Sequence, residues 1–190
     1  VSSISGITLI TLQGIGMVGV TGISMRLFTA LAKENVNVIL ISQASSENSI
    51  SVAIDESNVI RAYESIKNEF KREIDNGQIS EVNREGDLAI VAIVGENMKR
   101  TTGIAGKLFS TLGRNGINVI AIAQGASELN ISWVVKREEL RKTLNVVHES
   151  FFLSENVELN VFLMGIGTVG GNLLQQLKTQ QKRLLETKRL

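Results

Sequence analysis

Hydrophobic and polar positions follow two different periods along the first part of the chain. Residues 7–12, ITLITL, form a β-rich run, and apolar side chains then recur at helical spacing from Ile23 to Leu31. The run NVILIS, which begins at Asn37, is apolar on both faces, like a buried strand. ISVAI, at residues 50–54, alternates after a polar turn, so these last two runs predict a hairpin.

A second helical stripe and a closing strand follow the hairpin. The strand is expected at residues 79–84, ISEVNR, and Asn35 is expected to end the first helix, because asparagine tolerates the left-handed conformation. The order β-α-β-β-α-β predicts an α+β fold made of the ferredoxin-like unit. The apolar stripe of the second helix consists of Val59, Ile60, Tyr63, Ile66 and Phe70.

The chain contains this unit twice. Residues 7–54 align without a gap with residues 88–135, at an offset of 81, and 17 of the 48 aligned positions are identical. The identical positions gather in the loop before the first helix and at the end of the buried strand, where Gln43 recurs as Gln124. An internal duplication of this length predicts two similar domains within one chain.

The repeated residues predict a binding site for a small amino acid in each copy. Backbone N–H groups at the start of a helix suit a carboxylate, and the carboxamide of Gln43 offers two donors and an acceptor. The ferredoxin-like arrangement is expected to bring the loop, the backbone of residues 37–39 and Gln43 to one small volume, whereas a sugar phosphate would require lysine or arginine. The alternatives are that Asn37 caps a turn and that Gln43 pairs with an edge-strand amide. The predicted effector-binding residues are Met17, Gly22, Ile23, Asn37, Val38, Ile39 and Gln43, with Met98, Gly103, Ile104, Asn118, Val119, Ile120 and Gln124 in the second copy.

Two long stretches resemble a known family. GMVGVTGISMRLFTALAKENVNVILISQASSENSISVAI, at residues 16–54, resembles the first of the paired ACT domains in the regulatory region of aspartate kinases. GENMKRTTGIAGKLFSTLGRNGINVIAIAQGASELNISWVV, at residues 95–135, resembles the second. The resemblance implies ACT domains at residues 6–85 and 86–152, with residues 1–5 completing the sheet of the second. It also implies that the region senses threonine or lysine for feedback inhibition. The resemblance includes no kinase catalytic region, so the chain itself is expected to have no catalytic residues and not to be an enzyme.

The C-terminal residues resemble the opening of homoserine dehydrogenase. From Val157 the chain reads VELNVFLMGIGTVGGNLLQQL, where Gly165, Gly167 and Gly170 match the fingerprint of a dinucleotide-binding fold. Residues 153–190 are therefore expected to form a strand and a helix of a truncated Rossmann domain, as in bifunctional aspartate kinase-homoserine dehydrogenase. The resemblance implies NAD(P) and Mg-ATP as cofactors of the longer enzyme. We expect no cofactor in this chain, because it lacks the second strand whose acidic residue would hold the ribose.

Other interpretations remain open. Gly14, Gly16 and Gly19 also spell G-x-G-x-x-G between a strand and a helix, but the second copy keeps only Gly95 at these three positions. Phosphate binding at this loop is therefore a weak alternative. The chain could also be a purely structural dimerisation module, or a nucleotide-binding fragment of an NAD(P)-dependent oxidoreductase. The glutamine that occurs in both copies argues against the structural module.

Composition restricts the partners. A formal charge of +1 with 21% charged residues indicates no general affinity for nucleic acid or for an anionic membrane. The chain has no cysteine, which excludes disulfides and thiolate metal sites, and it has no apolar run near the roughly 20 residues that span a bilayer. We therefore expect a cytoplasmic protein without a metal. We also expect a homodimer, because a second copy would cover the sheet edges that the apolar strands leave open.

Overall fold

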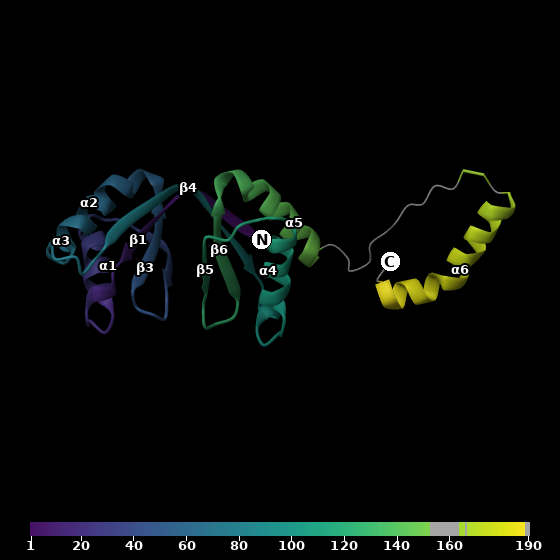
Figure 1. The fold of residues 1–190 in the computed structure, drawn as a ribbon, viewed down its shortest axis with the longest axis horizontal. Coiled ribbons are helices and arrows are strands. Elements are labelled where there is room, and N and C mark those ends of the chain that lie inside the picture. Colours follow the sequence, from purple (N-terminus) through teal and green to yellow (C-terminus); the bar gives the residue numbers. More distant parts are fainter. Residues whose placement is uncertain (153–163, 166, 189–190) are drawn as a thin grey trace. The chain divides into compact units, whose positions relative to one another are not determined.

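The computed structural model describes residues 1–152, 164–165 and 167–188. They divide into two compact units, residues 1–147 and 148–190. No helix within the described ranges is both long enough and apolar enough to cross a membrane. The elements are β1 (Ser2–Gln13), α1 (Ile23–Lys33), β2 (Val38–Gln43), β3 (Ser49–Asp55), α2 (Val59–Glu69), α3 (Lys71–Asp75), β4 (Glu81–Val94), α4 (Ile104–Arg114), β5 (Ala121–Gln124), β6 (Asn130–Lys136), α5 (Leu140–Phe152) and α6 (Thr168–Lys188) (Figure 1).

The first unit contains one antiparallel sheet with the strand order β2-β3-β1-β4-β6-β5. Its two central strands, β1 and β4, are long and serve both repeats. Residues 81–85 of β4 pair with residues 9–13 of β1, whereas residues 89–92 of β4 pair with residues 2–5 of β1. The first repeat therefore completes its half of the sheet with its own residues 81–85, whereas the second half is completed by residues 2–5, which precede the first repeat.

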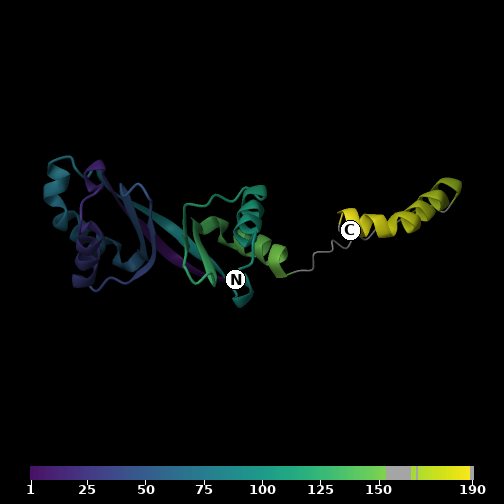
Figure 2. The same cartoon turned by 90° about the horizontal axis from the view of Figure 1, so that it is seen from below.

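The two long strands bend where they pass from one half of the sheet to the other. Gly6 has a φ of 73° and Asp87 a φ of 57°, and the register between β1 and β4 shifts at this point. Helices α1, α2 and α3 cover the outer face of one half, α4 and α5 cover the outer face of the other, and the two uncovered sheet faces are turned toward each other (Figures 1 and 2). A buried apolar cluster fills the space between these faces and consists of Ile7, Leu9, Leu40, Ala53, Leu88, Ile90 and Val134.

The helical faces of the sheet carry the other hydrophobic core residues. Asn35, with a φ of 53°, and its counterpart Gly116, with a φ of 65°, follow the ends of α1 and α4, which confirms the predicted helix ends. The predicted stripe of α2 is wrong at Ile60, which is 74% exposed. Val59 already occupies the inward face at that turn, and the next residue lies about 100° further around the helix. In the first repeat the buried helical side chains include Leu27, Leu31, Ala62, Ile66 and Phe70.

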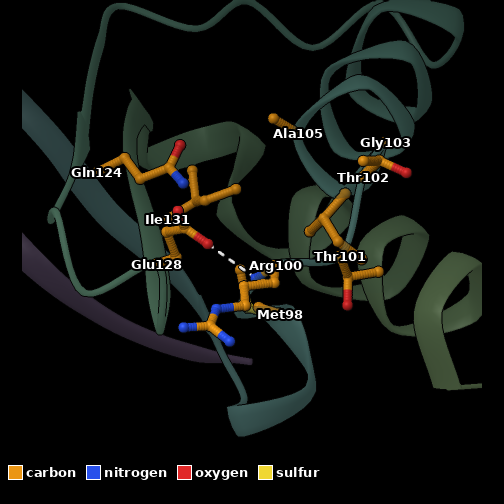
Figure 3. A pocket seen from close by; sticks show the side chains of 10 residues that line it. Met98, Arg100, Thr101, Thr102, Gly103, Ala105, Gln124, Glu128 and Ile131 are labelled. Carbon is orange, nitrogen blue, oxygen red and sulfur yellow. Dashed lines mark hydrogen bonds between the residues drawn. The ribbon is translucent and has the colours of Figure 1, made fainter.

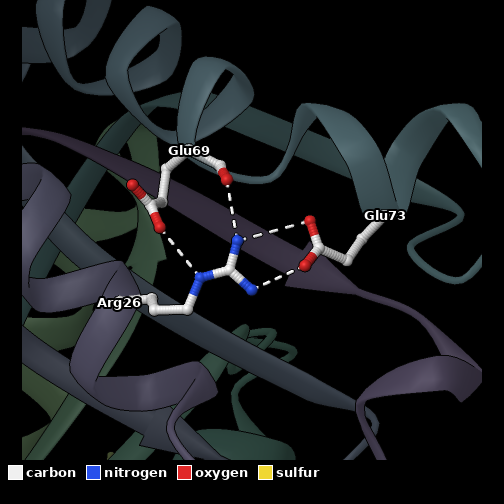
Figure 4. Close-up of polar contacts among 3 residues, drawn as sticks. All are labelled: Arg26, Glu69 and Glu73. Atoms are coloured by element: carbon white, nitrogen blue, oxygen red, sulfur yellow. Dashed lines mark hydrogen bonds and ion pairs between the residues drawn. The ribbon is translucent and has the colours of Figure 1, made fainter.

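Arg26 joins three helices at the start of α1 (Figure 4). Its Nε donates to Oε1 of Glu69 at 2.8 Å, and its terminal nitrogen donates to Oε1 of Glu73 at 2.6 Å. The guanidinium also lies 4.6 Å from the centre of the Phe70 ring. The hydrogen bond from Arg26 lowers the pKa of Glu73, and the two carboxylates, Glu73 first, raise the pKa of Arg26. This cluster fixes the first turn of α1 against α2 and α3, directly after the loop that carries the candidate site.

Candidate functional site

Helices α1 and α4 begin without a side-chain cap. Gly22 precedes α1 with a φ of 89° and Gly103 precedes α4 with a φ of 86°, a conformation that favours glycine. Neither position shows a capping side chain within the part of the chain that the structure describes. The first backbone N–H groups of an α-helix have no partner inside the helix. Both helix starts therefore offer N–H donors and a partial positive charge to an anionic group.

A pocket lies at the start of α4 in the second repeat (Figure 3). Its volume is about 330 Å³. On one side is the loop before α4 together with the first residues of that helix, and on the other side are the end of β5 and the hairpin that follows it. The lining residues are Met98, Arg100, Thr101, Thr102, Gly103, Ile104, Ala105, Gln124, Glu128 and Ile131.

Strand pairing places the glutamine of the pocket. Gln124 is the last residue of β5 and pairs with Ile131 of β6, whose side chain is buried. Because side chains of paired residues share a face of the sheet, Gln124 lies on the helical face, next to the start of α4. Met98, which is 8% exposed, also lines the pocket. The pocket thus joins four residues of the predicted set, Met98, Gly103, Ile104 and Gln124.

The first repeat places the corresponding residues in the same way. Gln43 ends β2 and pairs with Ile50 of β3, which is buried, just as Gln124 pairs with Ile131. Met17 is buried before α1, and Gly22 and Ile23 begin that helix. The equivalence of the two repeats therefore extends from sequence to the position of the glutamine relative to the helix start.

The remaining predicted residues lie at the other end of the edge strands. Asn118, Val119 and Ile120 do not line the pocket. Six residues of extended chain separate Asn118 from Gln124, or about 20 Å. The N–H of Ile120 donates to the carbonyl of Val134 at 2.9 Å, and its side chain packs against the cluster between the sheet halves. In the first repeat, Ile39 packs against the same cluster, Val38 packs against the core of its own repeat, and Asn37 is exposed.

Two acidic residues near the site were absent from the sequence prediction. The backbone N–H of Gly19 donates to Oε2 of Glu47 at 3.0 Å, and that of Arg100 donates to Oε2 of Glu128 at 2.8 Å (Figure 3). Each bond joins the hairpin after the glutamine to the loop before the helix. Glu47 and Glu128 are one of the 17 identical pairs of the duplication. That identity was the available signal, but it did not show which group the carboxylate would contact.

The glycines of the first loop have a packing role. A Cβ atom on Gly14 would lie 2.3 Å from the carbonyl oxygen of Gln78. A Cβ atom on Gly16 would lie 2.5 Å from the Cβ of Gln78. The N–H of Gly16 donates to the carbonyl of Gln78 at 3.0 Å, and that of Gly14 donates to the carbonyl of Asn48 at 2.9 Å. Close backbone contact thus accounts for both glycines, and their amides already have partners. The geometry does not support a phosphate cradle at this loop.

The described part of the C-terminal segment contains the glycines of the expected fingerprint. Gly165 has a φ of 98°, and Gly170 lies in the first turn of α6. The expected strand at residues 157–163 lies outside the described residues. The described glycines and helix do not by themselves form a dinucleotide site, because that site also needs an acidic residue on a second strand. Among the residues described, no group of histidine, aspartate or glutamate side chains could hold a metal ion.

Comparison with known proteins identifies the family of the repeats. A family model described as the ACT domain matches residues 10–70 and 91–151. The chain is 38% identical over 185 residues to bifunctional aspartokinase/homoserine dehydrogenase 1, chloroplastic, of Arabidopsis thaliana, which covers 97% of this chain and 20% of the relative. It is 35% identical over 184 residues to the bifunctional aspartokinase/homoserine dehydrogenase of Haemophilus influenzae, which covers 97% of this chain and 22% of the relative. The chain therefore spans about a fifth of the length of these curated relatives.

Solved structures share the fold of the two repeats. The ligand-free regulatory subunit of aspartate kinase from Thermus thermophilus matches with a TM-score of 0.66 at 25% identity, over 79% of this chain and 95% of that chain. The aspartate kinase of Clostridium acetobutylicum matches with a TM-score of 0.69 at 22% identity, over 78% of this chain and 34% of that chain. These matches confirm the resemblance that the sequence indicates. The chain belongs to the ACT domain family and carries a tandem pair of ACT domains of the kind found in the regulatory regions of aspartate kinases.

Proposed function

We propose that each repeat binds a small amino acid, threonine or lysine, and that this binding regulates a longer aspartate kinase. The observation that carries the proposal is the pocket in which a glutamine carboxamide lies beside an uncapped helix start (Figure 3). The helix N–H groups suit the effector's carboxylate, and Gln124 suits its ammonium or hydroxyl group. A volume of about 330 Å³ is at the small end of ligand pockets.

The regulated enzyme in this proposal is an aspartate kinase fused to homoserine dehydrogenase. The bifunctional relatives, which align with 97% of this chain, support this assignment, as do the glycines at Gly165, Gly167 and Gly170. The longer enzyme would use Mg-ATP in its kinase part and NAD(P) in its dehydrogenase part, while this chain supplies the sensor. Effector binding would shift the arrangement of the ACT domains against the catalytic parts, with a coupling free energy of about 1–3 kcal/mol.

Isothermal titration of the 190-residue chain tests the sensor directly. We expect saturable binding of threonine or lysine, and no binding of methionine or NADPH. Methionine is the matched control, because it has the same zwitterionic backbone but neither a hydroxyl group nor a side-chain ammonium. Binding of NADPH alone would favour the nucleotide-binding alternative, and no heat with any of the three amino acids would contradict the sensor proposal.

We also propose that the first repeat mediates a homodimer. Its loop and the first turns of α1 expose Ile15, Val18, Val20 and Met25, of which Ile15 is 87% exposed. The counterparts in the second repeat are Glu96, Lys99, Thr101 and Gly106. The two repeats have the same fold, so the apolar character of this surface is specific to the first repeat. Contiguous exposed apolar side chains are typical of an interaction surface, and a second copy would cover them.

Light scattering at micromolar concentration tests the dimer. We expect a mass of about twice the 20.7 kDa of one chain. The double variant Ile15→Glu, Val18→Lys, which introduces the residues of the second repeat, is expected to be monomeric because charged side chains would be buried in the contact. A wild-type mass equal to that of one chain, or a dimer that survives this double substitution, would contradict the proposed interface.

A further inference from the structure

Each repeat contains a bond between two segments that are 28 residues apart in the sequence. In the second repeat, Glu128 lies in the turn between β5 and β6, and its carboxylate accepts from the N–H of Arg100 in the loop before α4. In the first repeat, Glu47 and Gly19 form the same bond. A hydrogen bond to an ionised carboxylate is stronger than one between neutral groups. The same charge-assisted contact is thus formed twice in one chain.

The backbone at both ends of this bond is unusual. Glu47 and Glu128 have φ values of 57° and 59°, and Arg100 has a φ of 59°. Left-handed backbone favours glycine or asparagine, so a glutamate or arginine there is strained unless its surroundings compensate. The backbone preference of the turn therefore does not explain why glutamate occurs in both copies. The contact of its carboxylate with the loop does.

The bond crosses the side of the pocket. Gln124 and Glu128 are four residues apart in one hairpin, and Arg100 and Gly103 are three residues apart in the opposite loop. All four line the pocket (Figure 3). The contact between Glu128 and Arg100 therefore restricts how far the glutamine can move from the N–H groups at the start of α4.

We propose that Glu128, and Glu47 in the first repeat, are positioning residues that hold the pocket glutamine opposite the start of the helix. This inference rests on the proposed amino-acid site and adds residues that act on the effector through Gln124 and the loop. This role requires the acceptor oxygen, and the negative charge strengthens the bond. Glu128→Gln keeps an acceptor oxygen at the same length of side chain, whereas Glu128→Ala removes it.

The first measurement follows the bond itself, without any effector. In the ¹⁵N-labelled 190-residue chain, we expect exchange of the Arg100 amide proton with water to be about ten- to a hundredfold faster in Glu128→Ala, because a charge-assisted hydrogen bond is lost. Glu128→Gln keeps an acceptor oxygen but loses the charge, so its exchange rate is expected to lie between those of the wild type and Glu128→Ala. The Gly19 amide, held by Glu47 in the other repeat, is the internal control and should not change in either variant.

The second measurement is the affinity for whichever of threonine or lysine the wild-type chain binds. We expect binding at the second repeat to weaken about tenfold in Glu128→Ala, and to be partly restored in Glu128→Gln, which keeps an acceptor oxygen. Glu149→Ala, which removes an exposed acid from α5, is the control for net charge and should bind like the wild type.

The two measurements separate the possible failures. Unchanged exchange at Arg100 in Glu128→Ala, or equal weakening of affinity in the alanine and glutamine variants, would overturn the positioning role. If the wild-type chain binds neither amino acid, the proposed function fails, and the exchange of Arg100 still decides whether Glu128 holds the loop.

Discussion

Replacing Phe70 with alanine is expected to lower the free energy of unfolding by about 3–5 kcal/mol, the usual cost of removing a fully buried aromatic side chain. Phe70 is 0% exposed between α2 and α3, where it belongs to the core of the first repeat. The guanidinium of Arg26 also stacks on its ring. The variant would therefore lose core packing and the ring on which the guanidinium of Arg26 stacks.

The fluorescence of Trp133 makes this experiment informative about the whole sheet. Trp133 is the only tryptophan of the chain, and it is fully buried on β6, in the second repeat. Because β1 and β4 run through both halves of the sheet, we expect the two repeats to unfold as one cooperative unit. Phe70→Ala should then lower the denaturation midpoint that Trp133 reports, although the two residues lie in different repeats.

The counterpart of Phe70 provides the control. Phe151 lies 81 residues later and is only partly buried, so Phe151→Ala is expected to cost less than Phe70→Ala, because less apolar area is removed from the core. A Trp133 transition that does not move in Phe70→Ala, together with an earlier loss of circular dichroism, would show that the repeats unfold separately and that the shared strands do not couple them.

Replacing either repeated glutamine with alanine is expected to weaken effector binding at its own site by about 1.5–3 kcal/mol, because the lost hydrogen bond involves a charged or buried polar group. This corresponds to an affinity that is about ten- to a hundredfold lower. Gln43→Ala, Gln124→Ala and the double variant should keep the fold, since an exposed carboxamide at the end of a strand contributes little to the core. Titration with threonine and lysine measures the effect.

The two glutamine sites need not have equal affinity. Val18 and Gly19 in the first loop correspond to Lys99 and Arg100 in the second, which is therefore more polar. Gln175→Ala, an exposed position on α6, is the matched control and should leave binding unchanged. Wild-type affinity in all three glutamine variants, with normal circular dichroism, would show that the repeated glutamine is structural and would contradict the proposal that these repeats sense an amino acid.

The sequence predicted the order of the elements because its hydrophobic periods are clear, but it did not predict how the strands continue. The closing strand of the first repeat was expected at residues 79–84, so that residues 85 and 86 would separate it from the opening strand of the second repeat. In the structure β4 runs through them, because residues 81–85 pair with β1 on one side of the bend and residues 88–94 pair with β6 on the other. Pairing across the sheet overrides local turn preference here, and such pairing is not encoded in any short segment.

The sequence predicted only part of the candidate site. Met98, Gly103, Ile104 and Gln124 meet in the pocket because repeated identities and a helix start indicated them. Asn118 is also identical in both copies, but a strand extends about 3.3 Å per residue, so the two ends of one strand cannot line one small pocket. Identity between the repeats shows that both copies need the residue, but it does not show whether the residue serves binding or folding.

The pairing of the N-terminal residues with the second half of the sheet also means that order along the chain and order in space differ. Residues 2–5 lie beside residues 89–92, so the chain starts in the half that it will complete last. Topologically, the first half is an insertion into the second. A deletion of the first five residues would leave the half that follows them in sequence with all its strands. It would instead expose the backbone of residues 89–92 as a new open edge in the distant half, where an unpaired strand invites association with another chain.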